Sequence, residues 1–170
     1  PRRRPRGLRP AVGARARGRA LEPCGPLGYG GPSPPDAPGQ LAKVARGVRI
    51  PGATGGRLTT KAEFAPLLRA GAAEILQPAL GRVGGIGEAR KIAAMAECSN
   101  GQIAPHPDAG PVEWAANIHL AATCPNLLRI ETIETAFHSD LIRGAITVES
   151  GHVRPPDAPG LGIEVDEDLA

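Results

Sequence analysis

Aromatic residues are scarce in this sequence: phenylalanine, tyrosine and tryptophan together make up 2% of its 170 residues. A buried core must therefore be built from alanine, isoleucine, leucine and valine. The sequence also has no run of about 18 apolar residues, so no transmembrane helix is predicted. Its basic N-terminus lacks an apolar stretch behind it, which argues against a secretory signal. At this length we expect one domain that buries roughly 70% of its unfolded surface.

Cysteines are few, and none of them has the CxxC spacing of a metal or redox site. The three are Cys24, Cys98 and Cys124. An odd number at these spacings argues against a disulfide framework and against a zinc site. It favours a reducing compartment, so we expect a cytoplasmic location.

The net charge of +3 originates at one end of the chain. Residues 1–20 contain eight arginines and no acidic residue. The remaining 12 basic and 17 acidic residues give the rest of the chain a balance of −5. Residues 1–26 have no hydrophobic period, and we expect a disordered arm rich in Arg, Pro and Gly. Such an arm can contact nucleic acid electrostatically, but it has no interleaved aromatic residue to stack on bases, so nucleic-acid binding is the less favoured alternative.

The stretch 74–106 predicts a strand, a helix and a second strand. Ile75–Leu76 is an apolar run too short for a helix, and residues 88–97 carry alanine and isoleucine at helical spacing. After an Asn-Gly breaker the chain extends again through Ile103–Ala104, and the following Pro105 disfavours a helical residue before it. Such a unit is parallel and right-handed, with its functional edge where the strands end, so His106 is expected at that edge.

Similar units flank this stretch. Helices are predicted at 41–46, 60–70 and 112–122, and strands at 48–54 and 127–130. The strands recur about every 25 residues, short of the roughly 30 per unit of a complete eightfold barrel. The recurrence predicts an α/β fold with a parallel sheet.

The C-terminal part follows another pattern. Residues 146–149 alternate, Ser150-Gly151 is a turn signal, and His152–Val153 continues before a Pro/Gly-rich end. We expect a small hairpin and a tail over residues 137–170. His138 and His152 are expected to be exposed there.

The segments GAAEILQPALGRVGGIGEARKIAAMAE, QIAPH and GPVEWAANIHLAA together resemble the mandelate racemase and muconate-lactonizing branch of the enolase superfamily. Sugar-acid dehydratases belong to this branch, and the resemblance covers roughly residues 27–170. It implies a partial (β/α) TIM-type barrel over residues 27–136. The basic arm does not resemble the family's upstream barrel.

The resemblance implies removal of a proton from the carbon next to a carboxylate. In intact relatives, Mg²⁺ held by three carboxylates stabilises the resulting charge, and a lysine and a histidine serve the two faces of the substrate. His106 matches the basic histidine. Glu131 matches a glutamate that hydrogen-bonds the substrate carboxylate.

The sequence departs from the family pattern at several positions. Gly31 and Gly56 stand where two of the metal-binding acids are expected, and Ala79 stands where the histidine's aspartate partner is found. No counterpart of the third acid or of the lysine is found. The family's Mg²⁺ is therefore not expected to bind to this chain.

The resulting hypothesis is a truncated, impaired lyase or isomerase acting on a small carboxylate or sugar acid, with a non-catalytic remnant as the alternative. From the residues alone, His106 can also be a hydrogen-bonded loop histidine, and Glu131 a surface residue. Asp108 is a weaker candidate for orienting His106, and His119 is expected to be structural. Because a partial barrel exposes strand edges, we also expect self-association.

Overall fold

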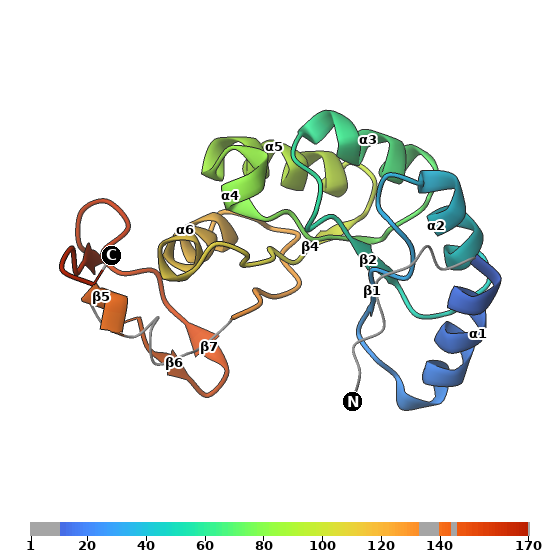
Figure 1. Cartoon of the computed structure of the whole chain (residues 1–170), viewed down its shortest axis with the longest axis horizontal. Helices are drawn as coiled ribbons and strands as arrows, with labels where there is room; N and C mark the ends of the chain where they lie inside the picture. Colours follow the sequence, from blue (N-terminus) through green and yellow to red (C-terminus); the bar gives the residue numbers. More distant parts are fainter. Residues whose placement is uncertain (1–10, 133–139, 144–145, 170) are drawn as a thin grey trace.

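The computed structural model describes residues 11–132, 140–143 and 146–169. Its centre is a four-stranded parallel sheet in the order β1-β2-β3-β4 (Figure 1). The strands are short: β1 is Tyr29–Gly30, β2 is Gly52–Thr54, β3 is Ile75–Leu76 and β4 is Gln102–Ile103. Neighbours in sequence are neighbours in the sheet, as in a barrel built of βα units. The predicted parallel α/β fold is confirmed.

The segment predicted as a strand at 127–130 continues the sheet by only a few bonds. Ile103 and Leu127 form an isolated parallel bridge, and the Leu128 N–H donates to the Ile103 carbonyl at 2.9 Å. Further along, the Glu131 N–H donates to the Pro105 carbonyl at 3.4 Å. Glu131 is therefore carried beside the backbone that leads to His106.

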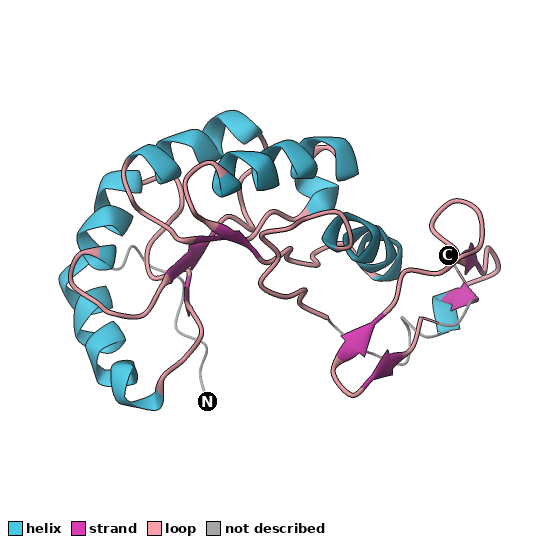
Figure 2. Ribbon diagram, turned by 180° about the vertical axis from the view of Figure 1, so that it is seen from behind, coloured by secondary structure: helices cyan, strands magenta, loops and turns pink. Residues whose placement is uncertain are grey.

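The helices follow one another along the outer side of the curved sheet (Figure 2). They are α2 (Pro38–Ala45), α3 (Lys61–Arg69), α4 (Leu80–Val83), α5 (Ile86–Glu97) and α6 (Pro111–Ala121). Glu63 stabilises the start of α3, where its carboxylate accepts the backbone N–H groups of Thr59 and Thr60. These bonds lower the pKa of Glu63. The helix continues through Pro66.

The two faces of the sheet are covered unequally. Leu76 and Ile103 join the main core against the helices, where Phe64, Leu67 and Ile92 are fully buried. The opposite, inner face has a small cluster of Ala53, Ile75 and Ala104, packed against Leu128. Alternating side chains of each strand thus point to a thick outer core and a thin inner one. The outer core consists of aliphatic residues and Phe64, which confirms the prediction of a core with few aromatic residues.

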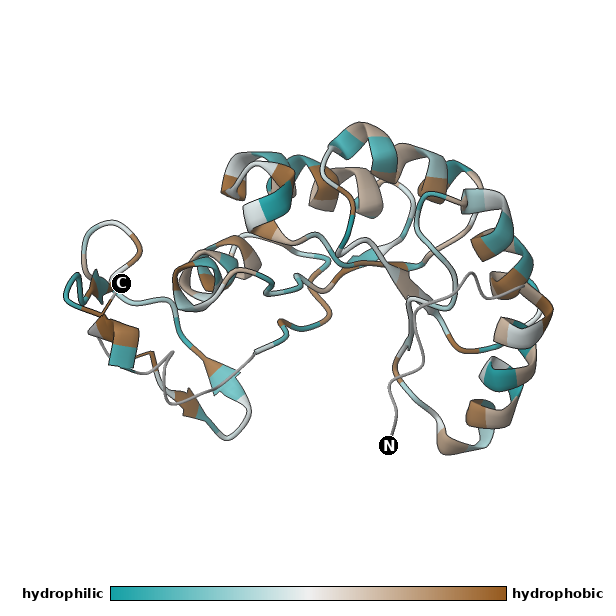
Figure 3. Cartoon of the chain, in the orientation of Figure 1, coloured by the Kyte–Doolittle hydropathy of each residue, from teal (hydrophilic) through white to brown (hydrophobic). Residues whose placement is uncertain are grey.

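The prediction of disorder is wrong for residues 11–21, which form helix α1 (Ala11–Leu21). Its buried positions are Ala11, Ala14 and Gly18, a face of small residues that lets α1 approach α2 closely. The Tyr29 hydroxyl donates to the Ala14 carbonyl at 3.0 Å. The helix alternates between hydrophilic and hydrophobic residues (Figure 3). This packing face has no large apolar side chain, so the sequence shows no hydrophobic period there. Residues 1–10 lie outside the described residues.

The predicted C-terminal hairpin is confirmed. Its strands are β6 (Val148–Glu149) and β7 (His152–Val153), antiparallel across a turn at Ser150-Gly151. A second antiparallel pair, β5 (Ile142–Arg143) with β8 (Glu164–Val165), was not predicted.

Of the histidines after His106, His119 has a structural contact, as expected. His119 Nε2 donates to the Leu161 carbonyl at 3.2 Å and so connects α6 to the C-terminal segment. His152 is exposed, as expected, and His138 lies outside the described residues.

In the part of the chain that the structure describes, no helix has the length and apolar character needed to cross a membrane.

Two glycines of α1 give a matched test of its packing. A Cβ on Gly13 would meet no atom closer than 3.8 Å, whereas one on Gly18 would lie 2.7 Å from a Val48 methyl. We expect Gly13→Ala to raise the free energy of unfolding by up to about 1 kcal/mol. Gly18→Ala should lower it by about 1 kcal/mol or more, because it overpacks the contact. Urea denaturation measures both; equal effects would mean that α1 does not pack as described.

Candidate active site

A pocket of about 220 Å³ lies at the carboxyl ends of the strands. Residues directly after three of the strands line it: Gly31 follows β1, Gly55 and Gly56 follow β2, and Gln77 follows β3. His106 lies three residues after the end of β4. The complete lining is Gly31, Ser33, Pro35, Thr54, Gly55, Gly56, Arg57, Gln77, His106 and Glu131. Pockets for drug-sized ligands have volumes of about 300–1,000 Å³, so this pocket suits a smaller molecule.

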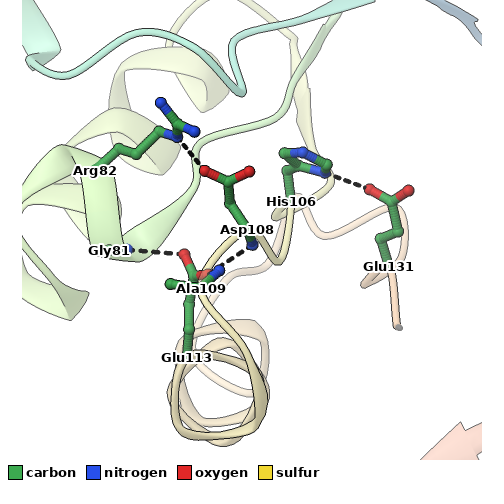
Figure 4. A network of polar contacts seen from close by, with 7 residues as sticks. All are labelled: Gly81, Arg82, His106, Asp108, Ala109, Glu113 and Glu131. Atoms are coloured by element: carbon green, nitrogen blue, oxygen red, sulfur yellow. Dashed lines mark hydrogen bonds and ion pairs between the residues drawn. The ribbon is translucent and has the colours of Figure 1, made fainter. Parts of the chain in front are cut away.

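The two predicted site residues meet in this pocket. His106 Nδ1 lies 2.6 Å from Glu131 Oε2 (Figure 4). An ionised carboxylate can only accept a hydrogen bond, so Nδ1 carries the proton and its N–H donates a hydrogen bond to Glu131. The other ring nitrogen, Nε2, is then left with a free lone pair. Because the side chains are 33% and 50% exposed, the contact orients the imidazole more than it stabilises the fold.

Gly56 sets how close the imidazole can come to the strand ends. A Cβ at this position would lie 2.6 Å from His106 Cδ2 and 3.4 Å from Nε2. The ring edge that bears Nε2 therefore lies against Gly56, inside the pocket. Any larger residue at position 56 would push the imidazole away.

Glu131 has a contact that the sequence did not predict. The sequence placed no acid at position 79, and Ala79 is indeed buried without a polar group. The expected loss of an orienting carboxylate does not follow, because Glu131 provides one from the neighbouring segment. No local sequence pattern indicates this contact, because His106 and Glu131 are 25 positions apart.

The residues of the pocket do not fit Mg²⁺. This ion requires about six oxygen ligands in near-octahedral order, with carboxylates among them. Glu131 is the pocket's one carboxylate among the described lining residues, and it is engaged with His106. At the expected acidic positions, Gly31 has a left-handed backbone with φ of 53° and Gly56 lies against the imidazole. Across the described ranges, no group of three acidic, histidine or cysteine residues could hold a metal.

Asp108 does not orient His106 by direct contact, contrary to the weaker prediction. It forms an ion pair with Arg82 on α4 (Figure 4). The hydrogen bond from Arg82 lowers the pKa of Asp108, and the same bond raises the pKa of Arg82.

Several lining residues were missed by the sequence reasoning. Arg57 brings a positive charge to the rim, and Ser33, Thr54 and Gln77 add neutral polar groups. Each lies within a few residues of a strand end. Their position near the strand ends is the sequence signal that points to them.

Comparison with known proteins gives concordant matches. The model of the family described as enolase C-terminal domain-like matches residues 7–169. The match therefore begins upstream of residue 27, and most of the basic segment belongs to the matched region. It corrects the expectation that this segment has no family counterpart.

D-Galactonate dehydratase from Ralstonia nicotianae is 37% identical over 159 residues, which cover 89% of this chain and 42% of that enzyme. A solved mandelate racemase/muconate lactonizing enzyme from a Sulfitobacter species has a TM-score of 0.91 and 66% identity. A similar protein from Roseovarius has a TM-score of 0.90 and 65% identity, and each comparison covers 94% of this chain and 40% of the other. The chain thus spans about two fifths of the length of these relatives.

The contact between Gly56 and His106 can be tested with two substitutions. Gly56→Ala should displace the imidazole and break its contact with Glu131, because its Cβ has no room. Gly30→Ala is the control, since a Cβ there would meet no atom within 4 Å. We expect the NMR signals of the His106 ring to change in Gly56→Ala and to stay as in the wild type in Gly30→Ala. Unchanged signals in both variants would contradict the described ring position.

Proposed function

This chain belongs to the enolase C-terminal domain-like family, in its mandelate racemase/muconate-lactonizing branch, and we propose from this that its pocket binds a small hydroxy acid. We further propose that His106 is the base that takes a proton from the carbon next to the acid's carboxylate. The observation that carries the proposal is the 2.6 Å contact between His106 Nδ1 and Glu131 in a pocket at the strand ends.

The contact gives His106 the chemistry of a general base. In this proposal Glu131 holds the proton on Nδ1, which leaves the lone pair of Nε2 free to accept a proton. When Nε2 takes up a proton, the imidazolium that forms lies beside a carboxylate, which stabilises it. Glu131 thus takes the place of the family's aspartate partner in this proposal.

Arg57 is the proposed partner of the substrate's carboxylate. A guanidinium binds a carboxylate through two parallel hydrogen bonds, and Arg57 lines the same pocket as His106. Ser33, Thr54 and Gln77 offer hydrogen-bonding groups for hydroxyls. D-Galactonate, named in the similar dehydratases, is a hydroxy acid of the required class.

The described residues do not supply all that the reaction needs. In the family a metal stabilises the charge that develops on the carboxylate, a contribution of several kcal/mol. The residues described here do not fit that metal, and Arg57 is a weaker substitute. We therefore propose binding with impaired proton abstraction, and sugar-acid dehydration as the reaction of the longer relatives. The glycines at positions 31 and 56 favour a non-catalytic remnant as the second candidate.

Titration with D-galactonate tests the binding proposal. We expect saturable changes in the His106 ring signals, and Arg57→Gln should weaken binding about tenfold through loss of a charge-assisted bond. Arg69→Gln on the exposed surface of α3 is the matched control and should bind as the wild type does. Equal affinity of the two variants would remove Arg57 from the proposal. The absence of saturable binding to the wild type would overturn it.

Two further measurements on the same protein separate the candidate functions. Exchange of the galactonate α-proton with deuterated solvent, lost in His106→Ala, supports an active base; no exchange in the wild type supports the remnant. We expect Mg²⁺ to leave the melting temperature unchanged. Saturable stabilisation by Mg²⁺, worth about 2.7 kcal/mol at a hundredfold excess over the dissociation constant, would contradict the assignment of the glycine positions.

Self-association is proposed for the same structural reason as in other open sheets. Among the described strands β1 has a partner on one side only, and the inner face is covered only by the cluster of Ala53, Ile75 and Ala104 with Leu128. Sedimentation velocity over a wide range of chain concentration should reveal association that increases with concentration. A monomer with a sharp, concentration-independent melt would contradict this.

A cytoplasmic location also stays a prediction. It is supported by the three cysteines, which are free in the structure.

A further inference from the structure

Glu113 is a buried carboxylate that the proposed chemistry does not use. It lies in the first turn of α6 and is 7% exposed. Among the buried residues that the structure describes, it is the one with a formal charge. A buried carboxylate is costly unless hydrogen bonds replace its water, so its partners show what holds it there.

Both oxygens of Glu113 accept backbone N–H groups. Oε1 accepts from Gly81 at 2.8 Å, and Oε2 accepts from Asp108 at 2.6 Å and from Ala109 at 2.5 Å (Figure 4). The bonds to Asp108 and Ala109 lie just before the start of α6 and resemble an N-terminal cap. The bond to Gly81 differs, because it reaches α4, which is 32 residues away in the chain.

The carboxylate thereby connects two segments that follow pocket residues, one after Gln77 and one after His106. Residues 107–110 link His106 to α6, and α4 follows β3. The ion pair between Arg82 and Asp108 joins the same two segments a second time. On the other side of the loop, the His106 N–H donates to the Pro78 carbonyl at 3.0 Å. The loop that carries the imidazole is thus held to the segment after β3 at both ends.

We propose that Glu113 is a positioning residue for His106. It fixes the loop after β4 so that Nδ1 stays on Glu131 and Nε2 stays over Gly56. The proposal rests on the assigned role of His106, but its test reads the ring itself and needs neither substrate nor turnover. Failure of galactonate binding therefore leaves this test intact.

The geometry selects glutamate over its amide. Glutamine has one acceptor oxygen, and its NH₂ group would face a backbone N–H, so it cannot serve both Gly81 and the loop. Gly81, Asp108 and Ala109 are exposed, so their N–H groups can turn to water when the carboxylate is lost. We therefore expect Glu113→Gln to fold with a released loop.

The ratio of the two neutral tautomers of His106, measured by ¹⁵N NMR, is the readout. The wild type should favour the Nδ1–H form that Glu131 requires. In Glu113→Gln the ratio should move about tenfold toward Nε2–H, equivalent to about 1.4 kcal/mol. Glu88→Gln is the matched control: Glu88 pairs with Lys61 and Lys91 on the outer helices and should leave the ratio unchanged.

Glu113→Asp keeps both oxygens on a side chain shorter by one methylene. It should give a ratio between those of the wild type and Glu113→Gln, and it decides the matter if the glutamine variant does not fold. A wild-type ratio in the folded variants would overturn the proposal and reduce Glu113 to a helix cap.

Discussion

The site depends on the parallel register of very short strands. The Ala104 N–H donates to the Leu76 carbonyl at 2.8 Å, and the Gln77 N–H donates to the Thr54 carbonyl at 2.9 Å. These bonds bring the ends of β2, β3 and β4 to one edge, where Gly56, Gln77 and His106 follow. A slip by one residue would turn every side chain to the other face and separate the imidazole from its pocket. The chemistry therefore rests on a few backbone hydrogen bonds, supported by the outer core.

Much of the scaffold could be predicted because breakers and periodicity mark it locally. The helix of residues 88–97 and the strands around Ile75 and Ile103 were found in this way, and they fixed His106 at the strand ends. Helix α1 was missed because alanine and glycine form its buried face, and such small residues carry no apolar period. The segment at 127–130 was predicted as a strand, but it forms one isolated bridge: Leu128 donates to Ile103 of β4, whereas the Leu127 N–H donates to Cys124 in the preceding turn.

The side-chain geometry of the site was less accessible to sequence reasoning. The contact between His106 and Glu131, and that between Glu113 and Gly81, join residues 25 and 32 positions apart. No local pattern encodes such distances. Asp108 was expected near the imidazole because it is close in sequence, yet Arg82 attracts it to α4. Proximity along a loop says little about the direction of a short side chain.

Gly56 and His106 are linked sterically, and this bears on how the site relates to its family. The imidazole occupies the space that a side chain at position 56 would need. An acid placed there would have to displace the ring. The observed position of the His106 imidazole therefore requires glycine at position 56. The pocket is therefore built around an imidazole and a carboxylate, with a guanidinium at its rim.

The most direct measurement of this account is the protonation pattern of the neutral His106 ring in the wild type and in Glu131→Gln. We predict that the wild-type ring carries its proton on Nδ1, and that Glu131→Gln, which lacks the charged acceptor, shifts it toward Nε2. An identical pattern in both proteins would contradict the central claim that Glu131 orients His106 across the ends of the parallel strands.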